Sequence, residues 1–209
     1  RADRQPEFTQ IDLEMSFVNE DDVMDIQEGF LKRVFKEVLD VDVQTPFLRM
    51  PWREAMDRFG SDKPDLRFGF ELKDISDIVK GCGFGVFSSA IEAGGSVRLI
   101  NVDGHAKDFP RKKIDKLGDF VKTYQAKGLA WARLVDGKVT SSYQKFLTDE
   151  ENAAILERAG AKDGDLVLIR RQSTAEKAVY RLLRASVSRL SMGIWEPVRT
   201  TGLVRFWSM

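Results

Sequence analysis

The chain has 209 residues, enough for one large domain or two small ones with apolar cores. Its 33 basic and 33 acidic residues balance, which excludes a global charge signature for nucleic-acid binding, and its single cysteine excludes an internal disulfide. With one histidine in addition, there are too few ligands for a zinc cluster. No apolar run approaches the roughly 20 residues of a membrane span, so the composition predicts a reduced, metal-free cytoplasmic protein.

The N-terminal stretch RADRQPEFTQIDLE predicts a β-strand with one polar face. On a strand, Phe8, Gln10, Asp12 and Glu14 would project together, while the intervening residues lie on the opposite face. A carboxylate on such a face could bind an ammonium group and a ring could stack on a heterocyclic base. Arginines in the preceding loop could clamp phosphate oxygens. The alternative is a solvated edge strand whose charges face water.

The next stretch predicts an amphipathic helix, because Val23, Ile26, Phe30, Val34 and Val38 recur at helical spacing after a capping sequence. Short extended pieces over residues 41–50 and a short helix over WREAMDRF follow. Residues 59–69 are rich in Gly, Ser, Asp and Pro and indicate a turn-rich domain boundary. Their charges could lie near a substrate, but a structural role at the junction is favoured.

Residues 72–80 are expected to form a helix, and the glycine-rich GCGFGVF is expected to open a strand over residues 84–87. This glycine pattern is weak evidence for a phosphate loop, because no convincing strand precedes it and no Gly-Lys-Ser/Thr follows. Alternation predicts a strand over residues 96–102. The lone His105 receives no catalytic role, because no nucleophile or carboxylate can be paired with it from sequence.

Residues 110–123 predict a helix with the basic start Arg111, Lys112, Lys113 and Lys116. Cations oppose the macrodipole at a helix N-terminus, so a phosphate partner or a solvated face would each explain them. A strand over residues 129–134, a hairpin turn at Asp136-Gly137, a helix over residues 149–159 and a buried LVLI strand complete the pattern. Helices and hairpins without regular βαβ alternation indicate an α+β fold.

Three groups of motifs carry a resemblance to bacterial-type aspartyl-tRNA synthetases. RADRQPEFTQID is similar to the second half of class II motif 2, and FGSDKPDLRFG is similar to the stretch at the edge of the inserted domain. GLAW, KFL and AKDGDLV resemble the insert itself, a GAD domain also found in a subunit of glutamyl-tRNA amidotransferase. The resemblance covers roughly residues 1–169. A basic tail and a helix expected over residues 175–190 follow, and the tail departs from the family.

The resemblance divides the sequence into two domains and a tail. Residues 1–68 would be part of the class II antiparallel-sheet catalytic domain, residues 69–190 the GAD-type insertion domain, and residues 191–209 a tail that does not match. The implied reaction converts aspartate and ATP to aspartyl-adenylate, then transfers the aspartyl group to tRNA(Asp). Mg²⁺ and arginines would offset the phosphate charge.

The resemblance also assigns roles within motif 2. Phe8 is similar to the aromatic residue that stacks on adenine, and Gln5 and Arg4 to residues that contact ATP. Arg1, with Arg4, matches positions near the tRNA acceptor end. Asp12 matches the carboxylate that holds the ammonium of aspartate, and Gln10 lines the same pocket.

Several parts of the family pattern lie outside the sequence: the anticodon-binding domain, motif 1 with its homodimer contacts, the start of motif 2, and motif 3 with its arginine. We therefore expect the chain alone to be inactive, although the parent enzyme is an aspartate–tRNA ligase. The alternative function is an isolated insertion domain that binds tRNA or another protein, for which the basic stretch of residues 111–116 is the sequence support.

Overall fold

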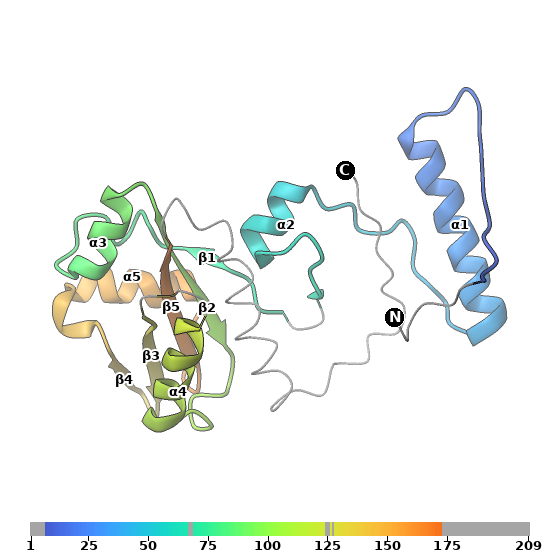
Figure 1. The fold of residues 1–209 in the computed structure, drawn as a ribbon. Coiled ribbons are helices and arrows are strands. Elements are labelled where there is room, and N and C mark those ends of the chain that lie inside the picture. The colour runs from blue at the N-terminus through green and yellow to red at the C-terminus, as the bar shows by residue number, and fades with distance from the viewer. Residues whose placement is uncertain (1–6, 67–68, 124–125, 127, 173–209) are drawn as a thin grey trace. The chain divides into compact units, whose positions relative to one another are not determined.

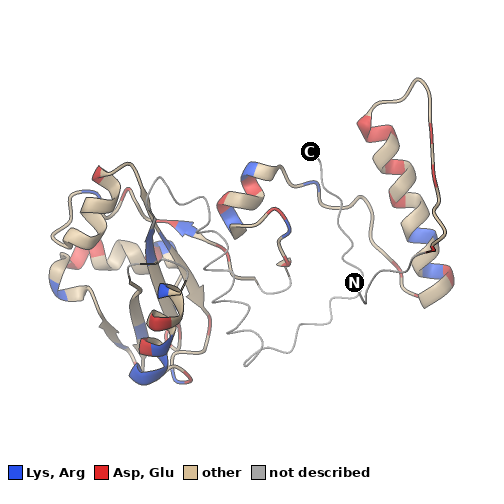
Figure 2. Ribbon diagram, viewed as in Figure 1, with Lys and Arg blue, Asp and Glu red and all other residues tan. Residues whose placement is uncertain are grey.

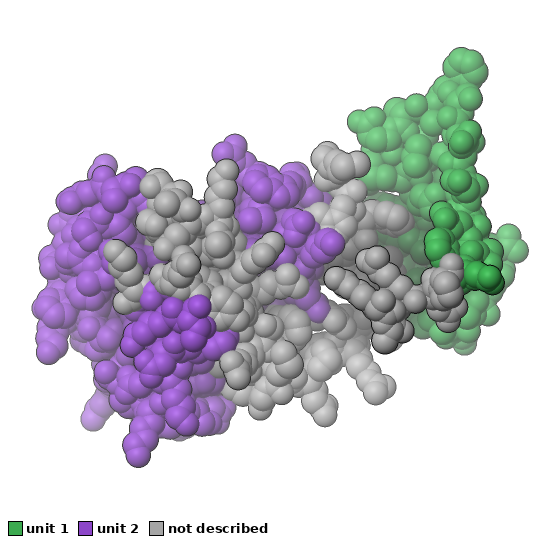
Figure 3. All heavy atoms as spheres, in the orientation of Figure 1, with its two compact units in different colours: residues 1–49, 199–208 green, residues 50–198, 209 purple. Residues whose placement is uncertain are grey.

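The computed structural model describes residues 7–66, 69–123, 126 and 128–172. Contacts divide the chain at residue 50, so the described residues form two units, 7–49 and 50–172, which Figure 3 colours separately. The expected helix over residues 175–190 and the tail lie outside the described residues.

The first unit contains the long helix α1, Glu20–Leu39. Asn19 and Asp22 form a capping box that satisfies the first backbone N–H groups. Acidic residues occupy the first turn and Lys36 the last, a distribution visible in Figure 2 that interacts favourably with the helix dipole. The helix ends at Asp40, whose left-handed φ of 51° lets its N–H bond back to Lys36. The helix predicted from the spacing of Val23 to Val38 is therefore confirmed.

Arg49 ties the segment after α1 back onto that helix. Its guanidinium bonds Asp21 and lies 2.9 Å from Asp25 Oδ1 and 3.7 Å from the buried Glu28 carboxylate. Val43 and Phe47 are buried in the same segment. Residues 41–50 were expected to form short extended pieces, and the structure assigns neither helix nor strand to them.

The predicted strand over Phe8 to Met15 is wrong. The structure assigns no strand to residues 7–15, and the chain reverses direction before α1 (Figure 1). A strand exists only through hydrogen bonds to a neighbouring strand, and the described residues 7–49 include none. The residues do alternate in polarity, but the described part of this unit contains no strand with which they could form a hydrogen-bonded ladder.

The second unit is built on a five-stranded antiparallel sheet with the order β1-β2-β5-β3-β4. Its strands are β1, Lys73–Asp74, β2, Ser96–Val102, β3, Ala130–Val135, β4, Lys138–Ser141, and β5, Leu166–Gln172. The helices are α2, Trp52–Phe59, α3, Gly85–Glu92, α4, Arg111–Lys122, and α5, Asp149–Ala159, with the 3-10 turn η2, Gln144–Phe146. Helices combined with an antiparallel sheet confirm the α+β class (Figure 1).

The sheet separates two apolar cores because successive side chains of a strand point to opposite faces. Leu99 and Ile169 join one cluster, which includes residues from α3 and α5. Ile100 and Leu168, their sequence neighbours, join the other cluster with Ile114 of α4. All four sheet residues are no more than 1% exposed. The apolar runs of β2 and β5 are therefore explained by burial on both faces.

Residues 72–80 do not form the predicted helix. Lys73 and Asp74 pair with β2, and the next residues are held by long-range bonds from Ile75 N–H to the Val97 carbonyl (2.9 Å) and from Val97 N–H to Ser76 Oγ (2.9 Å). The apolar residues Ile75 and Val79 of this stretch are buried. Pairing with the edge of β2 takes the place of a helix at Lys73 and Asp74, and only a turn follows, closed by the bond from Val79 N–H to the Ile75 carbonyl (3.1 Å).

The predicted strand over residues 84–87 is also wrong, because helix α3 begins at Gly85. Gly83 explains the glycine-rich sequence here. A Cβ at this position would lie 2.7 Å from the backbone oxygen of Phe146, so the loop and the 3-10 turn could not approach this closely with a larger residue. Gly83 therefore serves close packing of two backbone segments, whereas Gly81 adopts a left-handed φ of 79° and Gly85 has open space around it.

Asp165 joins the end of β2 and the loop after it to the loop before β5. Its carboxylate, in a residue 5% exposed, accepts hydrogen bonds from Asn101 Nδ2 (2.8 Å), Gly104 N–H (2.7 Å) and Lys162 N–H (2.9 Å). Burial alone would raise the pKa of Asp165, but these hydrogen bonds and the nearby charge of Lys162 lower it below the usual value. The AKDGDLV motif thus encodes the start of β5 and the carboxylate that fixes its surroundings.

Candidate functional site

The residues predicted to bind ATP and aspartate lie in the exposed segment before α1. Phe8 is 75% exposed, and Gln10 and Asp12 are exposed as well. Arg1, Arg4 and Gln5 lie outside the described residues. The structure does not bring Phe8 or Asp12 into a described pocket, so their roles stay predictions.

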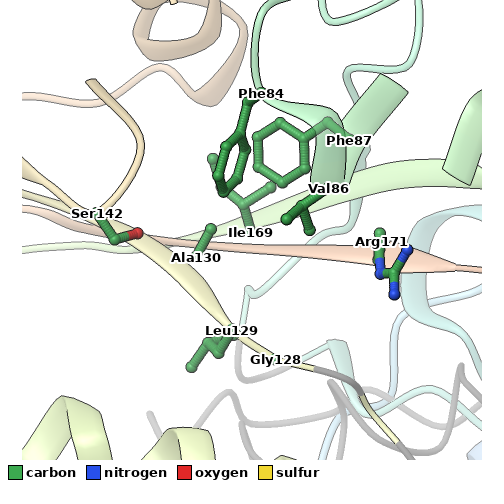
Figure 4. Close-up of a pocket in the computed structure, with 9 residues that line it drawn as sticks. All are labelled: Phe84, Val86, Phe87, Gly128, Leu129, Ala130, Ser142, Ile169 and Arg171. Atoms are coloured by element: carbon green, nitrogen blue, oxygen red, sulfur yellow. The ribbon is translucent and has the colours of Figure 1, made fainter. Parts of the chain in front are cut away.

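The second unit contains a pocket on the α3 side of the sheet, with a volume of about 270 Å³. Its lining is mostly apolar and comes from α3 and its N-terminal loop, from the start of β3, from the residue after β4 and from β5: Phe84, Val86, Phe87, Gly128, Leu129, Ala130, Ser142, Ile169 and Arg171. Figure 4 shows both phenylalanine rings on one side of the β5 ribbon, with Ser142 and Arg171 at opposite ends of the view. The pocket is therefore an apolar chamber with one polar group at each end.

Aromatic contacts fix the wall of this pocket. The rings of Phe84 and Phe87 meet edge to face with centroids 4.7 Å apart, and Phe84 stacks on Phe146 at 5.1 Å. Such arrangements suit the charge distribution of the rings. Phe146 is 47% exposed, so the aromatic surface continues from the pocket to solvent.

The two polar groups of the pocket differ in their bonding. Ser142 Oγ accepts a hydrogen bond from Trp131 N–H at 3.0 Å and lies 3.4 Å from the Trp131 carbonyl, so it is engaged within the sheet. The Arg171 guanidinium makes no hydrogen bond or ion pair with the described part of the chain. Arg171 is half-buried, so among the described residues it presents a cation without an acidic partner at one end of an apolar pocket.

The basic start of α4 is partly engaged in contacts of its own. Arg111 bonds Asp115 at 2.9 Å and lies over the Trp131 ring, with 5.1 Å between the guanidinium carbon and the ring centroid. Lys113 lies 5.8 Å from the centroid of Phe109. Lys112 and Lys116 are exposed, and Figure 2 shows basic residues at one end of α4 with acids further along. The helix therefore presents mixed charge to solvent.

The remaining candidate groups serve packing. His105 Nδ1 lies 2.8 Å from Asp108 Oδ2 within one loop, and that pair has no nucleophile beside it among the residues described. Burial raises the pKa of the Cys82 thiol, so this core residue stays protonated near neutral pH. Across the described ranges, no three His, Cys, Asp or Glu side chains gather as a metal site. None of the described helices is long and apolar enough to span a bilayer.

Sequence reasoning missed the pocket and Arg171. The signal available was the spacing of Ile169 and Arg171, which on a strand point to the same face. That pattern places a cation next to an apolar residue on a buried face. Finding the pocket also required knowing that α3 is a helix, whereas the glycine-rich sequence had suggested a strand there.

Comparison with known proteins agrees with these observations. The GAD domain family matches residues 87–182, a range that includes most of α3, all of α4 and α5, and four strands of the sheet. The aspartate–tRNA ligase of Ruminiclostridium cellulolyticum is 61% identical over 168 residues, 80% of this chain and 28% of that protein. The enzyme of the same name from Agathobacter rectalis is 56% identical over 194 residues, 92% of this chain and 32% of that protein. The one from Clostridium perfringens is 59% identical over 169 residues, 81% of this chain and 28% of that protein.

The chain thus spans about three tenths of the length of the relatives it matches. An alignment that covers 92% of this chain must include residues beyond Ile169, whichever residue it starts from. Identities of 56–61% over at least four fifths of the chain far exceed what shared fold alone requires. The chain belongs to the aspartate–tRNA ligase family, of which it represents a stretch containing the GAD domain.

Proposed function

We propose that this chain is a working part of an aspartate–tRNA ligase, which activates aspartate with ATP and transfers it to tRNA(Asp). The observation that carries this proposal is the 56–61% identity to proteins of that name. Residues 1–68 would belong to the catalytic domain and residues 69–190 to the GAD-type insertion domain. The enzyme would act as a homodimer in the cytoplasm.

The N-terminal segment would supply part of each ligand site. Asp12, with Gln10, would hold the ammonium of aspartate, and Phe8 would stack on adenine beside Gln5. Arg4 would contact ATP or the acceptor end, and Arg1 the acceptor end. The exposure of Phe8 and Asp12 supports this, because neither side chain is committed to the described core.

Mg²⁺ would act together with ATP in this reaction, where it neutralises phosphate charge. Mg²⁺ is commonly held by substrate phosphates and one or two carboxylates. We therefore expect it to arrive on the phosphate oxygens of ATP.

A chimera tests the proposed roles. This chain replaces the matching stretch of the Ruminiclostridium cellulolyticum enzyme, and aminoacylation kinetics are measured. Asp12→Asn should raise the KM for aspartate by about 30-fold or more, because an ammonium loses its charged partner. Phe8→Ala should raise the KM for ATP by roughly 5- to 150-fold, the usual range for a lost base stack.

Asp40→Asn is the matched control, because Asp40 is an exposed carboxylate at the end of α1 and asparagine tolerates its left-handed backbone. Circular dichroism checks that each chimera is folded. Equal aspartate KM values for the Asp12→Asn and Asp40→Asn chimeras would refute the assignment. The 209-residue chain alone should show no ATP–pyrophosphate exchange, and exchange at the rate of the intact relative would contradict the need for the missing motifs.

The tRNA-binding alternative gains no specific support from α4. Two of the four basic residues at its start, Arg111 and Lys113, already contact neighbouring side chains. Binding through Lys112 and Lys116 would be salt-dependent. A tRNA titration at 50 and 200 mM salt measures this directly, and no binding at the lower salt would exclude the alternative.

A further inference from the structure

We propose that the pocket between α3 and the sheet binds a peptide segment that carries one large apolar side chain next to an acidic residue. The apolar side chain would enter between Phe84, Phe87 and Ile169, and the carboxylate would pair with Arg171. None of these lining residues belongs to the motif 2 stretch, and the proposal does not depend on the ligase reaction.

The size of the pocket favours a single side chain. Cavities of roughly 150 Å³ hold a benzene ring, so the volume of about 270 Å³ admits one aromatic or long aliphatic group. Sites for whole small molecules usually measure roughly 300–1,000 Å³ and enclose most of the ligand. This pocket lies below that range, and its rim residue Val86 is 46% exposed. An occupant would therefore be partly enclosed.

The surroundings favour a peptide as the bearer of that side chain. Phe146, which stacks on Phe84, is 47% exposed and extends the apolar surface beyond the pocket mouth. A chain lying across Phe146 and Val86 would cover both residues while one side chain fills the chamber. Exposed aromatic surface that adjoins a pocket is typical of an interaction site.

Arg171 determines the charge of the partner. Its guanidinium has no partner within the described residues, whereas Ser142 at the other end is already bonded within the sheet. An arginine in a partly buried, apolar setting binds carboxylates strongly, because little water competes for its planar N–H groups. The partner therefore needs an Asp or Glu on one side of its apolar residue.

The test is an NMR titration of the ¹⁵N-labelled 209-residue chain with the peptide GSEFESG. We expect saturable amide shifts at Gly85 and Gly128, with a dissociation constant of about 1 mM for one buried ring and one ion pair. The peptide GSEAESG should give no saturable shifts up to 10 mM. GSQFQSG should bind at least about fivefold more weakly, because it lacks the charges.

Protein variants provide the reciprocal evidence. Arg171→Gln should weaken GSEFESG binding at least about fivefold but leave GSQFQSG unchanged, and Val86→Glu should abolish both. Arg33→Gln on α1 and Val139→Glu on β4, both at exposed positions outside the pocket, are the matched controls. Dispersed amide spectra verify that each variant is folded, and the peptide comparisons on the unsubstituted chain need no variant.

Several results would overturn the proposal. They are the absence of saturable shifts with GSEFESG up to 10 mM, shifts centred on α4 in place of the pocket, or equal affinity for the glutamate and glutamine peptides. Concentration-dependent line broadening at Gly85 without peptide would also overturn it, because a second copy of the chain would then occupy the pocket.

Discussion

Replacement of Asp165 by asparagine should be among the most destabilising single changes in the second unit. The carboxylate accepts three hydrogen bonds of 2.7–2.9 Å in a nearly buried position. An asparagine of the same shape has a single acceptor oxygen, so at least one N–H donor would face an NH₂ group. Hydrogen bonds to charged groups contribute roughly 1.5–3 kcal/mol and an unpaired buried donor costs roughly 1–3 kcal/mol. We expect Asp165→Asn to lower the free energy of unfolding by about 2–5 kcal/mol.

Urea unfolding at pH 7, followed by far-UV circular dichroism, measures this loss as a drop of roughly 1–2 M in the midpoint. Asp163→Asn is the control, because Asp163 lies two residues away and accepts one bond, from Gly137 N–H at 2.9 Å. The control should change stability by less than about 1 kcal/mol. A loss for Asp165→Asn no larger than that of the control would refute the reasoning.

The same pair gives a signed pH dependence. Folding lowers the pKa of Asp165 below 3.8, so its stabilisation is present above that value and is lost as the pH falls through the folded pKa. The stability gap between the natural chain and Asp165→Asn should be constant from pH 7 to 5 and shrink below about pH 4. A gap that stays constant or widens between pH 5 and 3 would contradict the role of the ionised carboxylate.

Four further substitutions test other parts of the fold by urea or thermal unfolding. Tyr143→Phe should leave the free energy of unfolding unchanged or raise it by about 1 kcal/mol, because the hydroxyl is buried without a hydrogen-bond partner in the described structure. A loss above about 1 kcal/mol would show that the hydroxyl is bonded. Gly83→Ala should destabilise by about 1–3 kcal/mol through its contact with the Phe146 carbonyl, whereas Gly29→Ala, with open space around it, should stabilise α1 by about 0.5–1 kcal/mol. If both alanines stabilise, the close approach at residue 83 is not a constraint. Thr148→Ala should cost about 1 kcal/mol by removing the capping box of α5, and an unchanged midpoint would mean that the cap contributes nothing.

Elements whose signals are local could be predicted from the sequence. Helix α5 was expected over residues 149–159 and occupies Asp149–Ala159, because Thr148 and Glu151 cap its start and Gly160 ends it with a left-handed φ of 67°. Strand β2 was expected over residues 96–102 and occupies Ser96–Val102. Motif 2 and the insert motifs were sufficient to indicate the family, because such long strings rarely recur by chance.

Elements that depend on distant partners could not be predicted. Residues 72–80 have helical spacing, yet Ile75 bonds the backbone of Val97 across the sheet. The stretch from Phe8 to Met15 alternates like a strand but has no neighbouring strand among the described residues of its unit. In the first case the distant partner supplied bonds that outweighed the local preference, and in the second the required partner was missing.

By itself, the sequence determined the family, the α+β class and the helices whose caps lie within a few residues of their ends. Tertiary structure alone decided where the glycine-rich loop packs, which residues line the pocket, and that Arg171 stands there without an acidic partner in the described chain. The physical reason is how far apart in the sequence the interacting groups lie. A cap or an alternation is satisfied by neighbours in the sequence, whereas a cavity and the charge at its mouth exist only once β5, the start of β3 and α3 have been brought together.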